Sequence, residues 1–141
     1  MSDLDSFGPR RNLAQLAQMS FDHIDFGPLS EALRQAIADK PDDAAALMEL
    51  SQIELMLGER ASSAALQDRA LSVSRVYADP NNPPQPDITA VAICARGDLM
   101  ANTPLEFLLE GSNIALHRVY VDPGEALPPL PAHDVAIVAV G

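Results

Sequence analysis

The residues best suited to ligand binding follow a short apolar run, Ile88 to Ala95, which predicts a buried strand. They are Arg96, Gly97, Asp98, Asn102 and Thr103. In open α/β sheets, ligands bind beyond the carboxyl ends of the strands, and a helix that begins there presents free N–H groups to anions. This loop is therefore the candidate ligand-binding site.

The same residues also suit a loop with a purely structural role. Thr103 and Glu106 stand where the N-cap and third residue of a helix are expected, and Gly97 can turn the chain. Asp98 and Asn102 can bond backbone groups of the loop. Because every loop of this kind needs caps and turns, whereas few bind ligands, we favour the structural interpretation by roughly two to one.

Other catalytic and metal-binding patterns are missing. The sequence has no GxxxxGK[ST], GxGxxG or GxSxG motif, which removes the usual signals for phosphate binding and for a nucleophilic serine. The histidines, His23, His117 and His133, are far apart and share no ligand spacing with Cys94. We therefore predict no catalytic residue, no metal site and no cofactor bound by this chain, and a buried, unreactive cysteine.

Three strands and one helix are expected to position the loop. The strands are Ile88–Ala95, Ile114–Val121 and Asp134–Val140, and a short helix is expected between residues 103 and 111. We predict that residues 88–141 form a small, incomplete Rossmann-like parallel sheet, ordered second, first, third strand. One short helix cannot cover both faces, so the upstream helices, another chain or further residues of a longer protein must do so.

The residues upstream predict a helical region, so the fold class is α followed by α/β. Residues 12–77 contain four helical patterns, with Pro28, Asp43 and Gly58 at predicted helix ends. Residues 1–11 are polar and predict a flexible terminus, and residues 78–87 contain four prolines and predict a linker. We expect the four helices to be antiparallel because their turns are short.

Composition limits the function. The chain has 9 Lys and Arg against 20 Asp and Glu, a net charge of −11, which opposes binding to nucleic acid. No apolar run approaches the length of about 20 residues that a membrane helix needs, and no secretory signal is apparent. We therefore predict a cytoplasmic protein of bacterial type without nucleic-acid or membrane partners.

The helical region carries a spacing typical of a repeat. Ala36-Ile37 and Ala70-Leu71 are equivalent pairs separated by 34 residues, and Pro41 and Gly58 stand at expected turns. In these features the region resembles the tetratricopeptide repeats. The resemblance implies a protein or peptide partner bound through the helices.

A second resemblance covers the C-terminal segment. The sequence GDLMANTPLEFLLE, followed by two apolar runs, resembles a segment of bacterial proteins that join a tetratricopeptide region to an ATP-grasp ligase-like domain. There, this segment is the small Rossmann-like domain preceding the ATP-binding part. The resemblance implies a parent protein that uses ATP and magnesium to join a carboxylate to an amine. No residue of this chain matches the lysines or acidic residues that hold ATP and magnesium in such enzymes.

Three functions follow as alternatives. In the first, the chain is the non-catalytic N-terminal part of an ATP-grasp carboxylate–amine ligase-like protein and contributes protein interaction and substrate positioning. In the other two, it is a tetratricopeptide-type interaction module or an autonomous α/β domain that binds a small molecule or nucleotide. The last apolar run, Asp134–Val140, has no lysine or proline to protect an exposed edge. We therefore also expect a homodimer through this edge when nothing else covers it.

Overall fold

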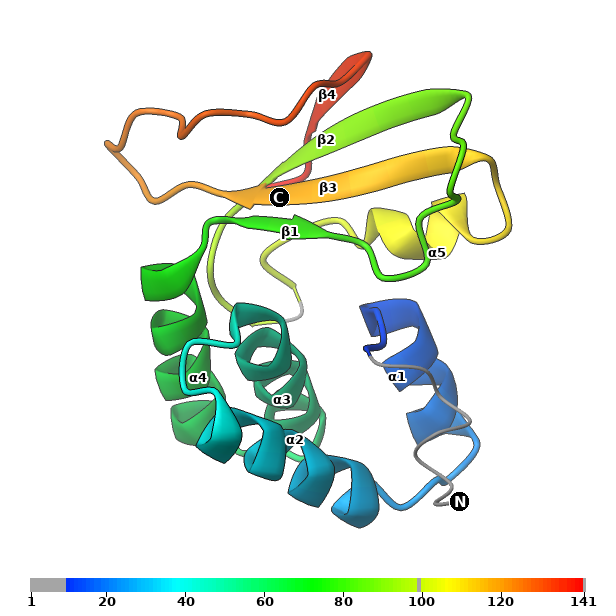
Figure 1. Cartoon of the computed structure of the whole chain (residues 1–141). Coiled ribbons are helices and arrows are strands. Elements are labelled where there is room, and N and C mark those ends of the chain that lie inside the picture. Colours follow the sequence, from blue (N-terminus) through cyan, green and yellow to red (C-terminus); the bar gives the residue numbers. More distant parts are fainter. Residues whose placement is uncertain (1–9, 99, 141) are drawn as a thin grey trace. The chain divides into compact units, whose positions relative to one another are not determined.

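The computed structural model describes residues 10–98 and 100–140 (Figure 1). The chain divides into two compact units, with the boundary between Val73 and Ser74. The helical unit contains α1 to α4, and the sheet unit contains β1 to β4 and α5. In its described part the chain is thus a mixed α plus β protein with five helices and one four-stranded sheet. None of the helices described is both long and apolar enough to cross a membrane.

The helices of the first unit begin close to their predicted signals. Their bounds are Leu13–Phe21 (α1), Gly27–Asp39 (α2), Ala44–Met56 (α3) and Arg60–Val73 (α4). Asn12 and Gln15 form a reciprocal capping box at the start of α1, and the Asp43 carboxylate accepts the Ala46 N–H at 3.0 Å at the start of α3. Gly58 has a φ of +84° in the turn before α4, which a glycine adopts at little cost.

The core of the helical unit is built around α3, which packs against the other three helices. The side chains that fill this core are almost fully buried: Leu16, Leu33, Leu47, Leu50, Ile53, Ala70 and Leu71. Burying each of the larger ones contributes about 1.5–3 kcal/mol. At the contact between α3 and α4, the Ser63 hydroxyl donates to the Ser51 carbonyl at 2.7 Å. These two small residues thus stand where α3 and α4 come close enough for a hydrogen bond.

The chain is anchored to α3 before α1 begins. Arg11 Nε lies 2.8 Å from Glu49 Oε1, with side-chain exposures of only 5% and 2%, and the Arg11 backbone N–H donates to the same oxygen at 2.6 Å. Arg10 pairs with Asp43 at 2.7 Å. Burial raises the pKa of Glu49, and the charge of Arg11 opposes this rise. The predicted flexible terminus is therefore wrong for Arg10 and Arg11, and its other residues lie outside the described part.

The sheet unit is mixed, not wholly parallel. Its strands are Val76–Ala78 (β1), Ile88–Cys94 (β2), Ile114–Tyr120 (β3) and Val135–Val138 (β4), and α5 is Leu105–Leu109. β2 pairs in parallel with β3 on one side and with β4 on the other. β1 adds an antiparallel partner to β3, giving the order β1-β3-β2-β4 (Figure 1). The prediction of a three-stranded, wholly parallel sheet thus lacked this fourth, antiparallel strand.

The strand β1 also corrects the predicted boundary. The helical region was expected to reach residue 77, but α4 ends at Val73. Tyr77 is buried and packs edge-on against Tyr120, with ring centroids 5.7 Å apart. The aromatic side chain therefore draws this segment into the sheet, where its backbone pairs with β3.

The predicted proline-rich linker, residues 78–87, belongs to the sheet unit as well. Prolines have no N–H to donate to a strand. Here the Asn82 side chain supplies the bonds instead: its oxygen accepts the Leu116 N–H at 2.7 Å, and its amide nitrogen donates to the Leu116 carbonyl at 3.0 Å. The Asn82 side chain thus joins the segment to β3 through the two hydrogen bonds that the backbone of a neighbouring strand would otherwise make.

The helix after β2 is shorter than predicted. We expected it to begin at Thr103 with a side-chain cap, but α5 begins at Leu105, with Pro104 at the N-cap and no side-chain cap bond. The Thr103 N–H donates to the Ala139 carbonyl at 2.8 Å. Thr103 is therefore held beside the residues that follow β4, and it lies one residue before the N-cap of α5.

The Arg11–Glu49 pair yields a stability prediction. In Arg11→Met the Glu49 carboxylate loses its cation inside the core, and we expect a loss of about 3–5 kcal/mol in the free energy of unfolding at pH 7. The loss should shrink as the pH is lowered toward 5. The reason is that the pKa of Glu49, already raised by burial, rises further, and protonation then removes the buried charge.

Urea unfolding followed by far-ultraviolet circular dichroism measures this loss. The control is Arg11→Met with Glu49→Gln, which removes both charges and keeps an oxygen for the backbone N–H of residue 11. This double variant should recover most of the loss. A single variant as stable as the parent would show that the pair contributes nothing.

Candidate functional site

The predicted site residues lie together in the loop between β2 and α5, where their side chains serve mainly the loop itself. The Asn102 oxygen accepts the Ala95 N–H at 2.8 Å, and its amide nitrogen donates to the Ala95 carbonyl at 2.7 Å. The Asp98 carboxylate accepts the Met100 N–H at 2.9 Å. Gly97 has a φ of +147°, and a Cβ there would lie 3.0 Å from that of Ala101. These contacts support the structural interpretation for Gly97, Asp98 and Asn102.

The Arg96 side chain contacts a residue outside this loop, Asp122, which follows β3. Its Nε donates to Asp122 Oδ1 at 2.7 Å and its Nη2 to Oδ2 at 2.8 Å. Arg75, just before β1, donates to Oδ2 at 3.1 Å and lies 3.5 Å from a carboxylate oxygen of Glu125. One carboxylate thus joins the ends of three neighbouring strands.

The electrostatics at Asp122 follow from these contacts. The bond from Arg96 is the main reason that the pKa of Asp122 lies well below its ordinary value. The carboxylate is 26% exposed and therefore remains partly screened by water. In the sequence, Asp122, Pro123 and Gly124 are typical only of a turn. The role of Asp122 as an ion-pair centre depends on β2 and β3 being adjacent, which the spacing of residues 75, 96 and 122 does not reveal.

The buried titratable groups of the sheet unit give no reactive nucleophile. Burial raises the pKa of the Cys94 thiol to about 11, so at neutral pH it is protonated. Cys94 is free and buried, as expected. Cys94 lies opposite Tyr120 of β3 in the sheet register. Among the residues that the structure describes, no three His, Cys, Asp or Glu side chains are placed to hold a metal ion.

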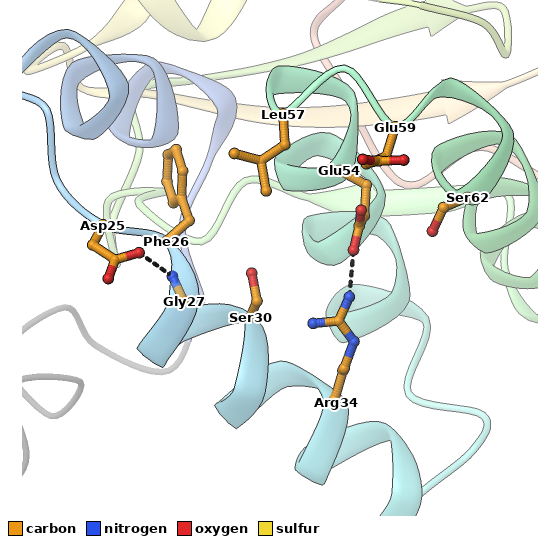
Figure 2. A pocket seen from close by; sticks show the side chains of 9 residues that line it. All are labelled: Asp25, Phe26, Gly27, Ser30, Arg34, Glu54, Leu57, Glu59 and Ser62. Carbon is orange, nitrogen blue, oxygen red and sulfur yellow. Dashed lines mark hydrogen bonds and ion pairs between the residues drawn. The ribbon is translucent and has the colours of Figure 1, made fainter.

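The helical unit has a pocket of its own, which we call the α2–α4 pocket (Figure 2). It is an open hollow of about 510 Å³ between the start of α2, the end of α3 and the start of α4. Phe26 and Leu57 form an apolar wall, and Ser30 and Ser62 add hydroxyl groups. Figure 2 shows the Ser30 hydroxyl pointing into the hollow.

Charged groups lie across the same pocket. Arg34 on α2 pairs with Glu54 on α3, whose side chain is only 7% exposed. The Asp25 carboxylate accepts the Gly27 N–H at 2.9 Å and so shapes the start of α2. Glu59 completes the polar side of the pocket (Figure 2). This site was not predicted, because Arg34 and Glu54 look like ordinary exposed residues of two separate helices. Only the packing of α2 against α3 brings them together.

Comparison with known proteins adds no identification. No family model matches the sequence, and it has no match among curated proteins or solved structures.

The ion pairs of Asp122 give the second prediction. Asp122→Asn should lower the free energy of unfolding of the sheet unit by about 1 kcal/mol at pH 7, the upper range for exposed pairs. The pKa of Asp122 is lowered in the folded state, so its contribution is present above the unfolded pKa of about 3.9 and is lost as the pH falls further. The difference between variant and parent should therefore narrow below about pH 4.

Tyrosine fluorescence during urea unfolding measures this effect. The chain has two tyrosines and no tryptophan, and both tyrosines lie in the sheet unit. Asp87→Asn is the matched control, because Asp87 forms no ion pair among the described residues. Equal effects of the two variants would contradict a specific role of Asp122.

Proposed function

We propose that this chain is the non-catalytic N-terminal part of an ATP-grasp carboxylate–amine ligase-like protein. In this proposal the sheet unit is completed by the ATP-binding part, and the helical unit binds a protein or peptide. The ligase-like activity, with its ATP and magnesium, belongs to that other part. The proposal joins the resemblance of GDLMANTPLEFLLE to such proteins with one structural observation, the exposure of β4.

β4 is an apolar strand at the edge of the sheet with both of its faces open. The exposed fractions are 42% for Val135, 37% for Ile137 and 75% for Val138. Successive side chains of a strand point to opposite faces, so the exposure of Ile137 and Val138 means that neither face is covered. Natural edge strands are usually blunted by charge, proline or a covering element. An uncharged, uncovered edge of this kind favours a surface that another segment covers.

The loop after β2 supports the non-catalytic part of the proposal. Arg96 is engaged by Asp122, and Asn102 is engaged by the backbone of Ala95. Binding a substrate through these side chains would require breaking contacts that hold the ends of β2 and β3. We therefore assign to this loop a role in holding the sheet, with substrate positioning secondary to it.

A second candidate function is that of an interaction module, favoured by the α2–α4 pocket. The hollow of about 510 Å³ is in the size range of ligand-binding clefts and carries both apolar and charged groups. It gives the helical unit a place to bind a partner without the sheet unit. The two candidates are compatible, because they use different units.

The third prediction separates the proposal from an autonomous nucleotide-binding domain. We expect this chain to bind magnesium-ATP no more tightly than about millimolar, about 4 kcal/mol, which a weakly complementary surface can supply. Isothermal titration calorimetry measures the affinity. Micromolar binding would overturn the proposal, and Arg96→Gln would then show whether the loop after β2 is the binding site.

The fourth prediction concerns β4. With nothing else covering the edge, a second copy of the chain should pair with it, and Val138→Lys should weaken this association by placing a charge in the middle of the strand. Because Val138 is 75% exposed, the substitution should leave the sheet folded. Sedimentation velocity over a range of concentrations measures the association.

Val138→Thr is the matched control, since it keeps a β-branched side chain without adding charge. It should associate more strongly than the lysine variant. The prediction that copies associate through β4 is contradicted if the parent chain stays monomeric at high concentration and the lysine leaves its sedimentation unchanged. The reading frame downstream of residue 141 provides a direct test of the larger proposal: an ATP-grasp sequence there supports it, and a stop codon overturns it.

A further inference from the structure

The charge of the α2–α4 pocket is unbalanced. Its lining contains three carboxylates, Asp25, Glu54 and Glu59, and one guanidinium, Arg34. Arg34 pairs with Glu54, so two carboxylates remain in excess. Glu59 forms no ion pair among the described residues, and like Glu54 it lines the pocket (Figure 2). The polar side of the pocket is thus complementary to a cation.

The buried parts of the pocket also suit a ligand. Ser30 is only 6% exposed, and its hydroxyl makes no hydrogen bond to another described residue although it points into the hollow (Figure 2). This hydroxyl is therefore available to accept a hydrogen bond from a ligand. Phe26 and Leu57 provide an apolar wall for an aliphatic chain.

Arg34 itself indicates the kind of cation that fits. Its side chain is 52% exposed, whereas Glu54, which it binds, is 7% exposed. A half-exposed guanidinium therefore neutralises a buried carboxylate in the pocket. A second guanidinium or ammonium, arriving from outside on an aliphatic stem, can share Glu54 with Arg34 or displace it, and can bind Glu59 at the same time.

We propose that the α2–α4 pocket binds a lysine or arginine side chain of a partner protein. The net charge of −11 steers such basic segments toward the chain, and the pocket then selects the long, cationic side chain. This inference rests on the second candidate function, that the helical unit is an interaction module, and names the chemistry of its partner.

The experiment is a nuclear magnetic resonance titration of the ¹⁵N-labelled chain with N-acetyl-arginine amide. The expected result is a saturable shift of the Gly27, Ser30, Glu59 and Ser62 amides, with a dissociation constant of about millimolar for this small probe. Glu59→Gln should weaken binding about threefold or more. Arg34→Gln should strengthen it, because Glu54 then has no internal competitor.

Glu31→Gln is the matched control. Glu31 is exposed on α2 outside the pocket, so this variant makes the same change in net charge and should bind the probe like the parent. N-acetyl-glutamate amide should produce no saturable shift. The proposal is overturned if the shifts spread over the acidic surface, or if Glu31→Gln and Glu59→Gln weaken them equally.

The titration is independent of the tests on the sheet unit. Saturable binding of the arginine probe together with micromolar ATP binding would keep the pocket and reject the ligase-part proposal. Weak ATP binding without pocket shifts would reject the pocket and leave that proposal standing.

Discussion

Backbone groups next to a buried strand need partners, and in the sheet unit two asparagine side chains supply them. Asn82 pairs with both backbone groups of Leu116 in β3, and Asn102 pairs with both backbone groups of Ala95, just after β2. Each amide offers one acceptor and donors in the arrangement that a neighbouring strand would offer. Asn82 continues the β1 side of β3, and Asn102 bonds the chain just past the end of β2, at places where proline or a turn prevents a regular strand. The position of the loop after β2, and of Arg96 within it, depends on the hydrogen bonds that the Asn102 side chain makes to the Ala95 backbone.

The helical unit shows how far local signals determine structure. Capping residues, a proline near the start of α2 and a glycine after α3 predict helix ends through contacts between near neighbours in sequence. Those signals therefore place the four helices within a few residues. The strand β1 has no such signal, because it is only three residues long and directly follows a helix. It forms since Tyr77 packs on Tyr120, a contact between segments about forty residues apart.

The candidate sites show the opposite balance. Residue types at the end of a predicted strand identified the loop containing Arg96 and Asn102, but its hydrogen bonds depend on Asp122 and on backbone groups of another segment. The α2–α4 pocket was not predicted at all. Its charged residues come from α2, from α3 and from the residues just before α2 and α4. No regular spacing distinguishes Glu54 or Glu59 from the solvated carboxylates of a chain this acidic. Electrostatic sites of this kind appear only when the helices are packed.

The contact between Arg11 and Glu49 also bears on the order in which the helical unit folds. α3 and α4 are joined by residues 57–59 alone, so their contacts form within a short loop, whereas Arg11 and Glu49 are 38 positions apart. Closing the longer loop costs more chain entropy, and it gains little until α3 holds Glu49 in place. We therefore expect the α3–α4 hairpin to act as the nucleus and α1 to dock last. During synthesis, α1 would then emerge first and would dock only after α3, which carries Glu49, has been made and folded.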